Sequence, residues 1–135
     1  MKTILIALSL SFAAAVSAAP TLSNGPSSKL VGQWNGRSLC VTSRPACTDE
    51  TVQYHIRKDK PEAENFHIQA DKVVNGEVQN MGELSCRFEA LRQQLICPQG
   101  KGQWQFRWDG DALVGGLLAD DGSLFRLIIV RRKTG

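Results

Sequence analysis

The stretch Leu30–Arg37, which reads LVGQWNGR, decides the fold. Gly32 stands two residues before Trp34, and a glycine there lets the backbone turn or pack closely without a side-chain clash. A buried tryptophan removes a large apolar surface from water, but its indole N–H still needs a hydrogen-bond acceptor. At the start of an antiparallel meander, such a pair predicts a plug for one open end of a small barrel.

Downstream of this stretch, apolar and polar residues alternate with a period of two, and helical periodicity is nowhere sustained. Turn-forming residues, such as those of Asn75-Gly76, separate the alternating segments. We expect eight strands, at about residues 31–41, 51–58, 65–74, 82–88, 94–97, 103–108, 112–119 and 123–132. An open sheet of these strands would expose two edges. The sequence therefore predicts an all-β fold that closes into an eight-stranded antiparallel up-and-down β-barrel.

The region before the first strand divides into two segments. Residues 1–18 have a positive start at Lys2, an apolar run, and small residues that end at Ala18, which is the pattern of an export signal. The apolar run is too short to span a membrane. Residues 19–29 are rich in Pro, Ser, Gly and Asn and predict a flexible arm. We expect a barrel domain over residues 30–133 of a secreted or periplasmic protein.

All four cysteines follow the signal segment, at Cys40, Cys47, Cys86 and Cys97. An even number in an exported chain favours disulfides, although four cysteines allow three pairings. Cys40 and Cys47 flank a short loop bent by Pro45, and pairing Phe88 with Leu95 places Cys86 opposite Cys97. We therefore expect Cys40–Cys47 and Cys86–Cys97 bonds. A zinc site fits less well, because no Cys-x-x-Cys spacing exists and the chain has two histidines.

The charge balance argues against nucleic-acid binding. Lys2 is one of the 16 basic residues, so 15 remain after signal removal against 13 acidic ones. The basic cluster 131–133 stands at the end of the chain, whereas nucleic-acid binding usually needs a basic face interleaved with aromatic residues. We expect no nucleic-acid partner, no membrane span and a monomeric protein.

The combination of Gly32-x-Trp34 on the first strand, eight meandering strands and an Arg on the last strand resembles the calycin superfamily, which includes lipocalins, fatty-acid-binding proteins and avidins. In that superfamily a cationic side chain packs over the Gly-x-Trp indole. The resemblance implies this role for Arg126, with Arg131 or Arg132 as alternatives. Avidins hold biotin with an Asn and a Ser at two positions after the Trp. The chain has Gly36 and Cys40 there, so biotin binding is not implied.

The chain is also similar, more weakly, to exported bacterial inhibitors of serralysin-type metalloproteases. These are small eight-stranded barrels with a Gly-Gln-Trp near the start, and they block a protease with a flexible N-terminal arm. Here Gly32–Trp34 follows the arm 19–29 in a comparable place. The residues of the arm do not match that family closely, and the second cysteine pair is foreign to it. This resemblance implies a secreted protease as an alternative partner.

Residues that could carry catalysis or bind a metal are few. His55 and His67 lie on polar faces of neighbouring strands, but Asp71 or Glu64 would have to complete a metal site. Ser85, like the serine at position 43, has no nearby base in the pattern. We therefore expect no catalytic residues, no metal and no cofactor, and a protein that is not an enzyme.

Aromatic residues on inward faces give the candidate ligand site. Trp104, Phe106 and Trp108 alternate on one strand, and Tyr54 stands on another. Such a stripe also suits plain core, because an eight-stranded barrel is just wide enough to hold one small ligand. Our leading hypothesis is a small apolar ligand at the barrel mouth near these four residues. The alternatives are an inhibitor or binder of a secreted hydrolase, and an envelope barrel filled solid.

Overall fold

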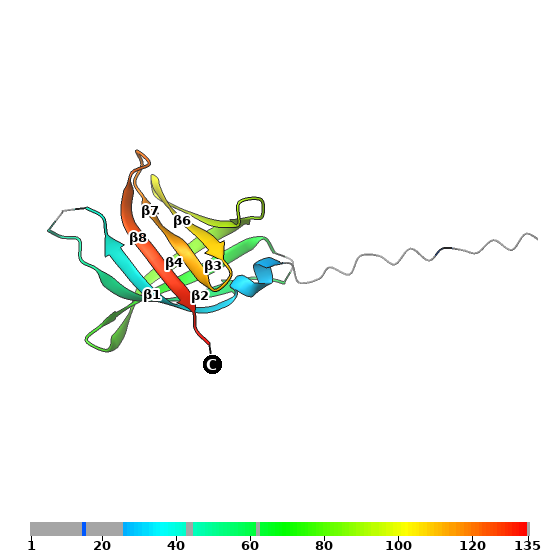
Figure 1. The fold of residues 1–135 in the computed structure, drawn as a ribbon, viewed down its shortest axis with the longest axis horizontal. Coiled ribbons are helices and arrows are strands. Elements are labelled where there is room, and N and C mark those ends of the chain that lie inside the picture. The colour runs from blue at the N-terminus through cyan, green and yellow to red at the C-terminus, as the bar shows by residue number, and fades with distance from the viewer. Residues whose placement is uncertain (1–14, 16–25, 43–44, 62, 135) are drawn as a thin grey trace, which may run out of the picture.

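The computed structural model describes residues 15, 26–42, 45–61 and 63–134. Within them, eight antiparallel strands follow a short 3₁₀ helix and close into one up-and-down barrel, in which the last strand pairs with the first (Figure 1). This confirms the predicted fold class. The elements are η1 (Pro26–Leu30), β1 (Gly32–Cys40), β2 (Glu50–Lys58), β3 (Asn65–Val74), β4 (Glu77–Glu89), β5 (Gln94–Gln99), β6 (Gly102–Asp109), β7 (Ala112–Leu118) and β8 (Leu124–Arg132).

β4 and β5 extend beyond their expected ends by more than a single residue. β4 begins at Glu77 rather than near residue 82, because the Asn75-Gly76 turn has positive φ at both residues and joins β4 directly to β3. β5 continues past Pro98 to Gln99 and stays paired with β6. Proline lacks a backbone donor, and this part of β5 has no ladder partner on its β4 side among the described residues.

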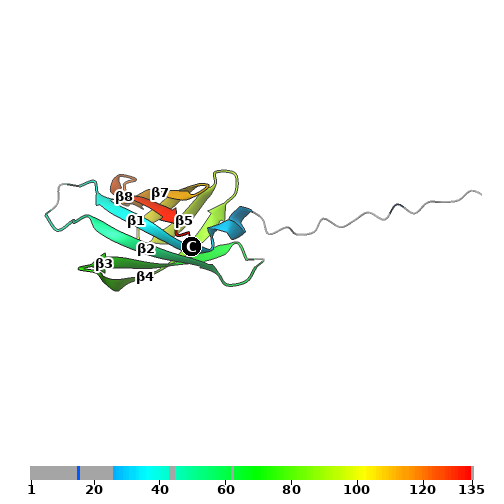
Figure 2. The same ribbon diagram turned by 60° about the horizontal axis from the view of Figure 1, so that its bottom comes forward.

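The barrel has two different ends. Figure 2 shows η1 at one end and the loop that follows β1 at the opposite end. We call the end with η1 and Trp34 the closed end, and the end with the Cys40–Cys47 loop the mouth. The largest side chains with no exposed surface form the core, and they are Trp34, Phe66, Phe106, Leu30, Ile68, Leu95, Leu113 and Ile128.

Trp34 seals the closed end. Its indole has no exposed surface, and its Nε1 donates a hydrogen bond to the Leu30 carbonyl oxygen at 2.9 Å. Leu30 is itself fully buried, because η1 turns the chain back over the ring. Gly32 has a φ of 138°, a conformation that glycine tolerates. A Cβ atom there would lie 3.0 Å from the Arg132 guanidinium.

The cation over Trp34 is Arg132, so the expectation of Arg126 is wrong. The guanidinium carbon of Arg132 lies 4.5 Å from the indole centroid, and Arg132 NH1 donates to the Val31 carbonyl oxygen at 3.0 Å. The register of β1 against β8 explains the difference, because Trp34 pairs with Arg132 whereas Cys40 pairs with Arg126 at the mouth. Both arginines stand on the inward-facing side of β8. Alternation along the strand therefore does not identify which of them reaches the plug.

The four cysteines form the two expected disulfides, Cys40–Cys47 and Cys86–Cys97. The first closes the loop at the mouth. The second joins β4 to β5 beside their last ladder pair, Arg87 with Ile96. By loop-closure entropy, each bond stabilises the fold by roughly 2–3 kcal/mol. Disulfides persist in oxidising compartments, so the pairing indicates an oxidising, extracytoplasmic environment.

The N-terminal expectations are tested only in part. The predicted export signal 1–18 and most of the predicted arm lie outside the described residues, apart from residue 15. The end of the arm, from Pro26 to Lys29, belongs to η1 rather than to a flexible segment. No helix in the described ranges has the length and apolar character to cross a membrane.

Substitutions at the plug should separate its parts. Trp34→Ala should lower the free energy of unfolding by about 3–5 kcal/mol, because it removes a fully buried aromatic side chain. Arg132→Ala should cost about 1–2 kcal/mol through the lost cation–π contact. Arg131→Ala is the matched control on the exposed face and should stay within about 0.5 kcal/mol. Urea unfolding measures all three. Equal stabilities of the two arginine variants would contradict the assignment of Arg132.

Candidate functional site

A cavity of about 220 Å³ lies at the mouth of the barrel. Its apolar lining residues are Ala70, Leu84, Trp104 and Leu117, and its polar ones are Ser38, Glu50, Tyr54, Gln99 and Arg126. Met81, Gly82 and Glu83 of β4 complete the lining. An apolar cavity with a few convergent polar groups is the usual form of a small-molecule site. The cavity is therefore the candidate site.

The largely buried side chain of Tyr54 lines this cavity. The residue is 3% exposed, and its ring packs edge-on against Phe106 with 5.9 Å between centroids. Its hydroxyl makes no hydrogen bond with any described residue. Burial raises the pKa of Tyr54 above its ordinary value, and the nearby Glu50 carboxylate raises it further. The hydroxyl therefore stays protonated and is available to a ligand as a donor or an acceptor.

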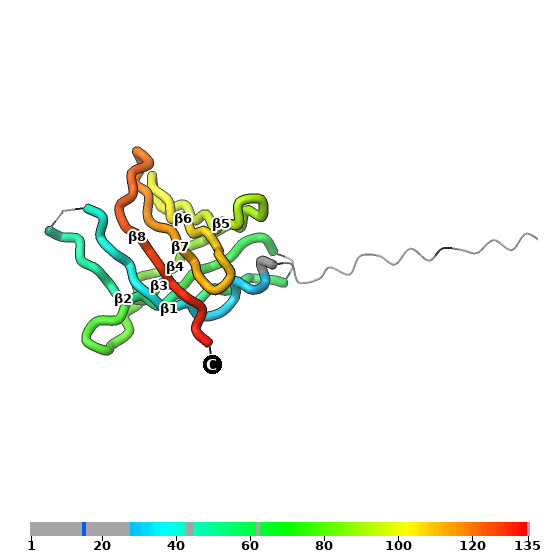
Figure 3. Tube along the Cα trace, in the orientation of Figure 1, coloured from blue at the N-terminus to red at the C-terminus, as the bar shows by residue number. Residues whose placement is uncertain are grey.

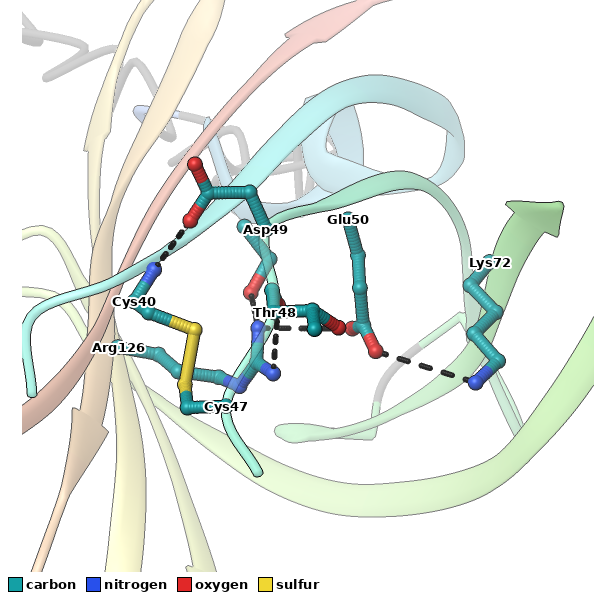
Figure 4. Close-up of a disulfide and its surroundings, with 8 residues drawn as sticks. Cys40, Cys47, Thr48, Asp49, Glu50, Lys72 and Arg126 are labelled. Carbon is teal, nitrogen blue, oxygen red and sulfur yellow. Dashed lines mark hydrogen bonds and ion pairs between the residues drawn. A yellow bond between two sulfur atoms is a disulfide. The ribbon is translucent and has the colours of Figure 1, made fainter. Parts of the chain in front are cut away.

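Arg126 organises the polar side of the mouth, as Figure 4 shows. Its NH1 donates to Ser38 Oγ at 3.0 Å, and its NH2 donates to the Thr48 carbonyl oxygen at 3.0 Å. The same NH1 lies 3.5 Å from Glu50 Oε2, and Lys72 Nζ lies 3.9 Å from the other oxygen of that carboxylate. The charge of Arg126 is thus balanced by Glu50. This ion pair makes the guanidinium a poor site for a ligand carboxylate.

The rim of the mouth on this side is held by the first disulfide. Cys40 is bonded to Cys47, and the Cys40 backbone N–H donates to Asp49 Oδ1 at 2.8 Å (Figure 4). Thr48, whose carbonyl oxygen accepts from Arg126, lies between Cys47 and Asp49, the two residues that attach the loop to Cys40. The loop therefore fixes the position of the guanidinium.

The structure separates the four residues that the sequence suggested for ligand binding. Tyr54 and Trp104 line the cavity, and Trp104 Nε1 donates to Gln99 Oε1 at 2.6 Å. Phe106 is fully buried behind them, stacked on Trp104 with 6.2 Å between centroids. It supports both rings from the core.

Trp108 does not belong to the mouth site. It lies at the closed end, where it packs edge-on against Phe88 and its Nε1 donates to the Gly110 carbonyl oxygen at 2.7 Å. A strand rises about 3.3 Å per residue, so Trp104 and Trp108 stand about 13 Å apart along β6. A cavity of this size cannot touch both. The structure therefore does not bring Trp104 and Trp108 to one cavity, and ligand binding by either residue stays a prediction.

The sequence pattern does not identify the polar lining of the cavity. It places Arg126 at the plug and gives no signal for Ser38, Glu50 or Gln99. One signal was available: Arg126 and Arg132 have the same inward phase, and they stand six residues apart on one strand. Two inward charges at opposite ends of a strand predict one at each end of the barrel.

The two histidines stand on the polar faces of β2 and β3, and neither lines the cavity. His55 Nε2 lies 3.5 Å from the buried carboxylate of Asp71. His67 Nε2 lies 2.8 Å from Asp59 Oδ2, and this hydrogen bond holds the pKa of Asp59 below its ordinary value. Among the described residues, no group of three or more His, Cys, Asp and Glu side chains is arranged to hold a metal ion.

Ser85 does have a base nearby, contrary to the expectation. Its Oγ lies 3.5 Å from His67 Nδ1, because β3 and β4 pair these two residues directly. The Glu83 carboxylate lies closer to the same nitrogen, at 3.2 Å, and it also pairs with Arg57 at 2.7 Å. The cluster therefore forms an exposed ion-pair network in which Glu83 competes with Ser85 for the imidazole.

Tyr54 is the only tyrosine in the sequence, so its ionisation can be followed directly by ultraviolet absorbance. The folded-state pKa is above the ordinary value of 10.0. The unfolded chain therefore loses this proton first, and stability falls as the pH rises past about 10. We expect tyrosinate to appear only as the barrel unfolds, with circular dichroism as the second readout. Ionisation near pH 10 in a folded barrel would contradict the burial of the hydroxyl.

The chain matches no protein-family model, and it has no significant similarity to any curated protein sequence. The geometry of the barrel and its mouth therefore carries the functional argument.

Proposed function

We propose that this protein is an exported, lipocalin-like barrel that binds a small, neutral ligand of about one aromatic ring in the mouth cavity. The observation that carries the proposal is the Tyr54 hydroxyl group at an apolar cavity, where it makes no hydrogen bond with any described residue. A ligand that hydrogen-bonds to this hydroxyl gains about 0.5–1.5 kcal/mol from the bond.

The size of the cavity limits the ligand. A dry apolar cavity of about 150 Å³ accommodates benzene, and drug-sized ligands occupy about 300–1,000 Å³. The mouth cavity, at about 220 Å³, suits one ring with one or two substituents. Retinoids, haem and long fatty acids are too large, because the closed half of the barrel is filled by core side chains.

The charges at the mouth limit the ligand further. Arg126 and Glu50 form an ion pair, and Lys72 adds a weaker contact to the same carboxylate. A charged ligand would have to separate this pair. A neutral ligand with a hydroxyl or carbonyl group can meet Tyr54 without doing so. The same features favour binding over catalysis, because burial moves the pKa of Tyr54 away from neutral pH.

The predicted export signal and the disulfides support an extracytoplasmic location. The Gly-x-Trp plug with its cation supports the resemblance to calycins, many of which carry small molecules. The alternative of an arm-type protease inhibitor stays a prediction, since the residues before Pro26 that would form the arm lie outside the described part of the chain.

Titration with p-cresol and toluene tests the proposal, with Trp104 fluorescence and calorimetry as readouts. We expect both compounds to bind, and Ala70→Leu to abolish binding by filling the cavity. Tyr54→Phe should weaken p-cresol by about two- to tenfold through one lost hydrogen bond, and leave toluene unchanged. Trp108→Phe, at the closed end, is the control and should change neither. Failure of both compounds to bind the unaltered protein would overturn the proposal.

A further inference from the structure

Backbone pairing in the barrel is incomplete between β4 and β5, a boundary that we call the seam. β4 pairs with β3 from Glu77 to Arg87, but the β4–β5 ladder covers only the pairs from Arg87–Ile96 to Glu89–Gln94. From Glu77 to Ser85, the other edge of β4 has no strand partner among the described residues. Figure 3 shows the β3–β4 hairpin projecting away from β5 and β6. An open edge presents unpaired backbone donors and acceptors, which can pair with an added strand.

The mouth cavity opens on this same seam. Its lining includes Met81 to Leu84 of β4 on one side of the gap, and Gln99 of β5 with Trp104 of β6 on the other. A strand that paired with β4 here would send every second side chain toward the barrel interior. One inward-facing side chain of the added strand would then lie at the cavity.

A β-bulge shapes the site. The β3–β4 register shifts after Ala70, which pairs with Gly82, while Asp71 pairs with Asn80. Met81 is the extra residue, and it lines the cavity while remaining 42% exposed. A bulge re-aims side chains and often marks a functional edge. Here it brings an adaptable methionine side chain to the junction of edge and cavity.

We propose that the ligand of the mouth cavity is a side chain of an extended segment of another polypeptide, which adds to the free edge of β4 as a further strand. This inference rests on the proposed function, because the same cavity takes the ring. The backbone of the segment hydrogen-bonds to β4 between Glu77 and Ser85. One aromatic side chain of the segment, Phe or Tyr, enters the cavity toward Trp104 and Tyr54.

The negative charge along the free edge of β4 favours a partner segment that carries basic residues. Between Glu77 and Cys86 the chain carries Glu77 and Glu83 and has no Lys or Arg. Arg57 compensates Glu83, but two copies of this edge would still bring two Glu77 carboxylates together, which disfavours self-pairing. Natural proteins often protect open edges with lysine, proline or a β-bulge; this stretch has the bulge at Met81 but neither lysine nor proline. A segment with basic residues beside its aromatic residue therefore fits the edge better than a second copy does.

Binding of a seven-residue peptide, acetyl-Thr-Lys-Thr-Phe-Thr-Lys-Thr-amide, tests the inference alongside toluene. We expect the peptide to bind the full protein at least about tenfold more tightly than toluene, since several backbone hydrogen bonds add to the ring contact. Two further peptides carry N-methyl groups on alternate amides. Methylation of the set that faces β4 should abolish the gain, and methylation of the other set should preserve it.

Two charge variants locate the strand. Glu77→Lys on the free edge should weaken the peptide by about threefold or more and leave toluene unchanged. Glu64→Lys makes the same charge change in the loop before β3, at the closed end, and should affect neither ligand. Ala70→Leu should abolish binding of both ligands.

The outcomes separate the two proposals. If toluene binds and the peptide gains nothing, or if both methylated sets behave alike, strand addition is overturned and the small-ligand function stands. If neither toluene nor the peptide binds, the cavity function fails. A dimer in sedimentation equilibrium that the peptide dissociates would identify a second copy as the natural occupant, and would also overturn the inference.

Discussion

The interior of this barrel depends on the hydrogen bond that Trp34 donates to the Leu30 carbonyl oxygen at 2.9 Å. A fully buried indole cannot leave its N–H unpaired without a large loss of stability. The chain before β1 therefore has to turn back over the ring, which it does as η1. This turn buries Leu30 and places the Val31 carbonyl oxygen within reach of Arg132. The indole N–H of Trp34 thus determines how the chain enters β1, where Arg132 packs and how the end of the barrel is closed.

Because the plug fills the barrel interior at the closed end, the apolar cavity lined by Tyr54 lies at the other end. β8 shows the division along its length, because its inward positions run from Arg126 at the mouth, through Ile128 and Val130 in the core, to Arg132 at the plug. Charged groups are least costly near solvent, and each arginine stands near an end of the barrel. Arg126 keeps Glu50 as its counterion. The mouth therefore presents a neutral polar surface above an apolar core.

The sequence predicted what local patterns determine. Alternation identified the strands, and the hairpin register that opposes Phe88 to Leu95 correctly paired Cys86 with Cys97. The β1–β8 register was not predictable in the same way, because it depends on closure of the whole barrel and so on every hairpin before it. This is why the plug cation was misassigned. The bulge at Met81 was equally hidden, and it places Asn80 beside the buried Asp71 carboxylate.

At the seam between β4 and β5, the two strands stay joined while the cavity stays open. A short ladder between two strands supplies few backbone hydrogen bonds. A longer ladder would bring β4 against β5 along the seam and cover the cavity. The Cys86–Cys97 bond stands where the ladder ends. A covalent link holds the strands together there without requiring the next residues to pair. β4 can therefore diverge toward the mouth, its edge from Glu77 to Ser85 unpaired by any described strand, while the closed half of the barrel stays intact.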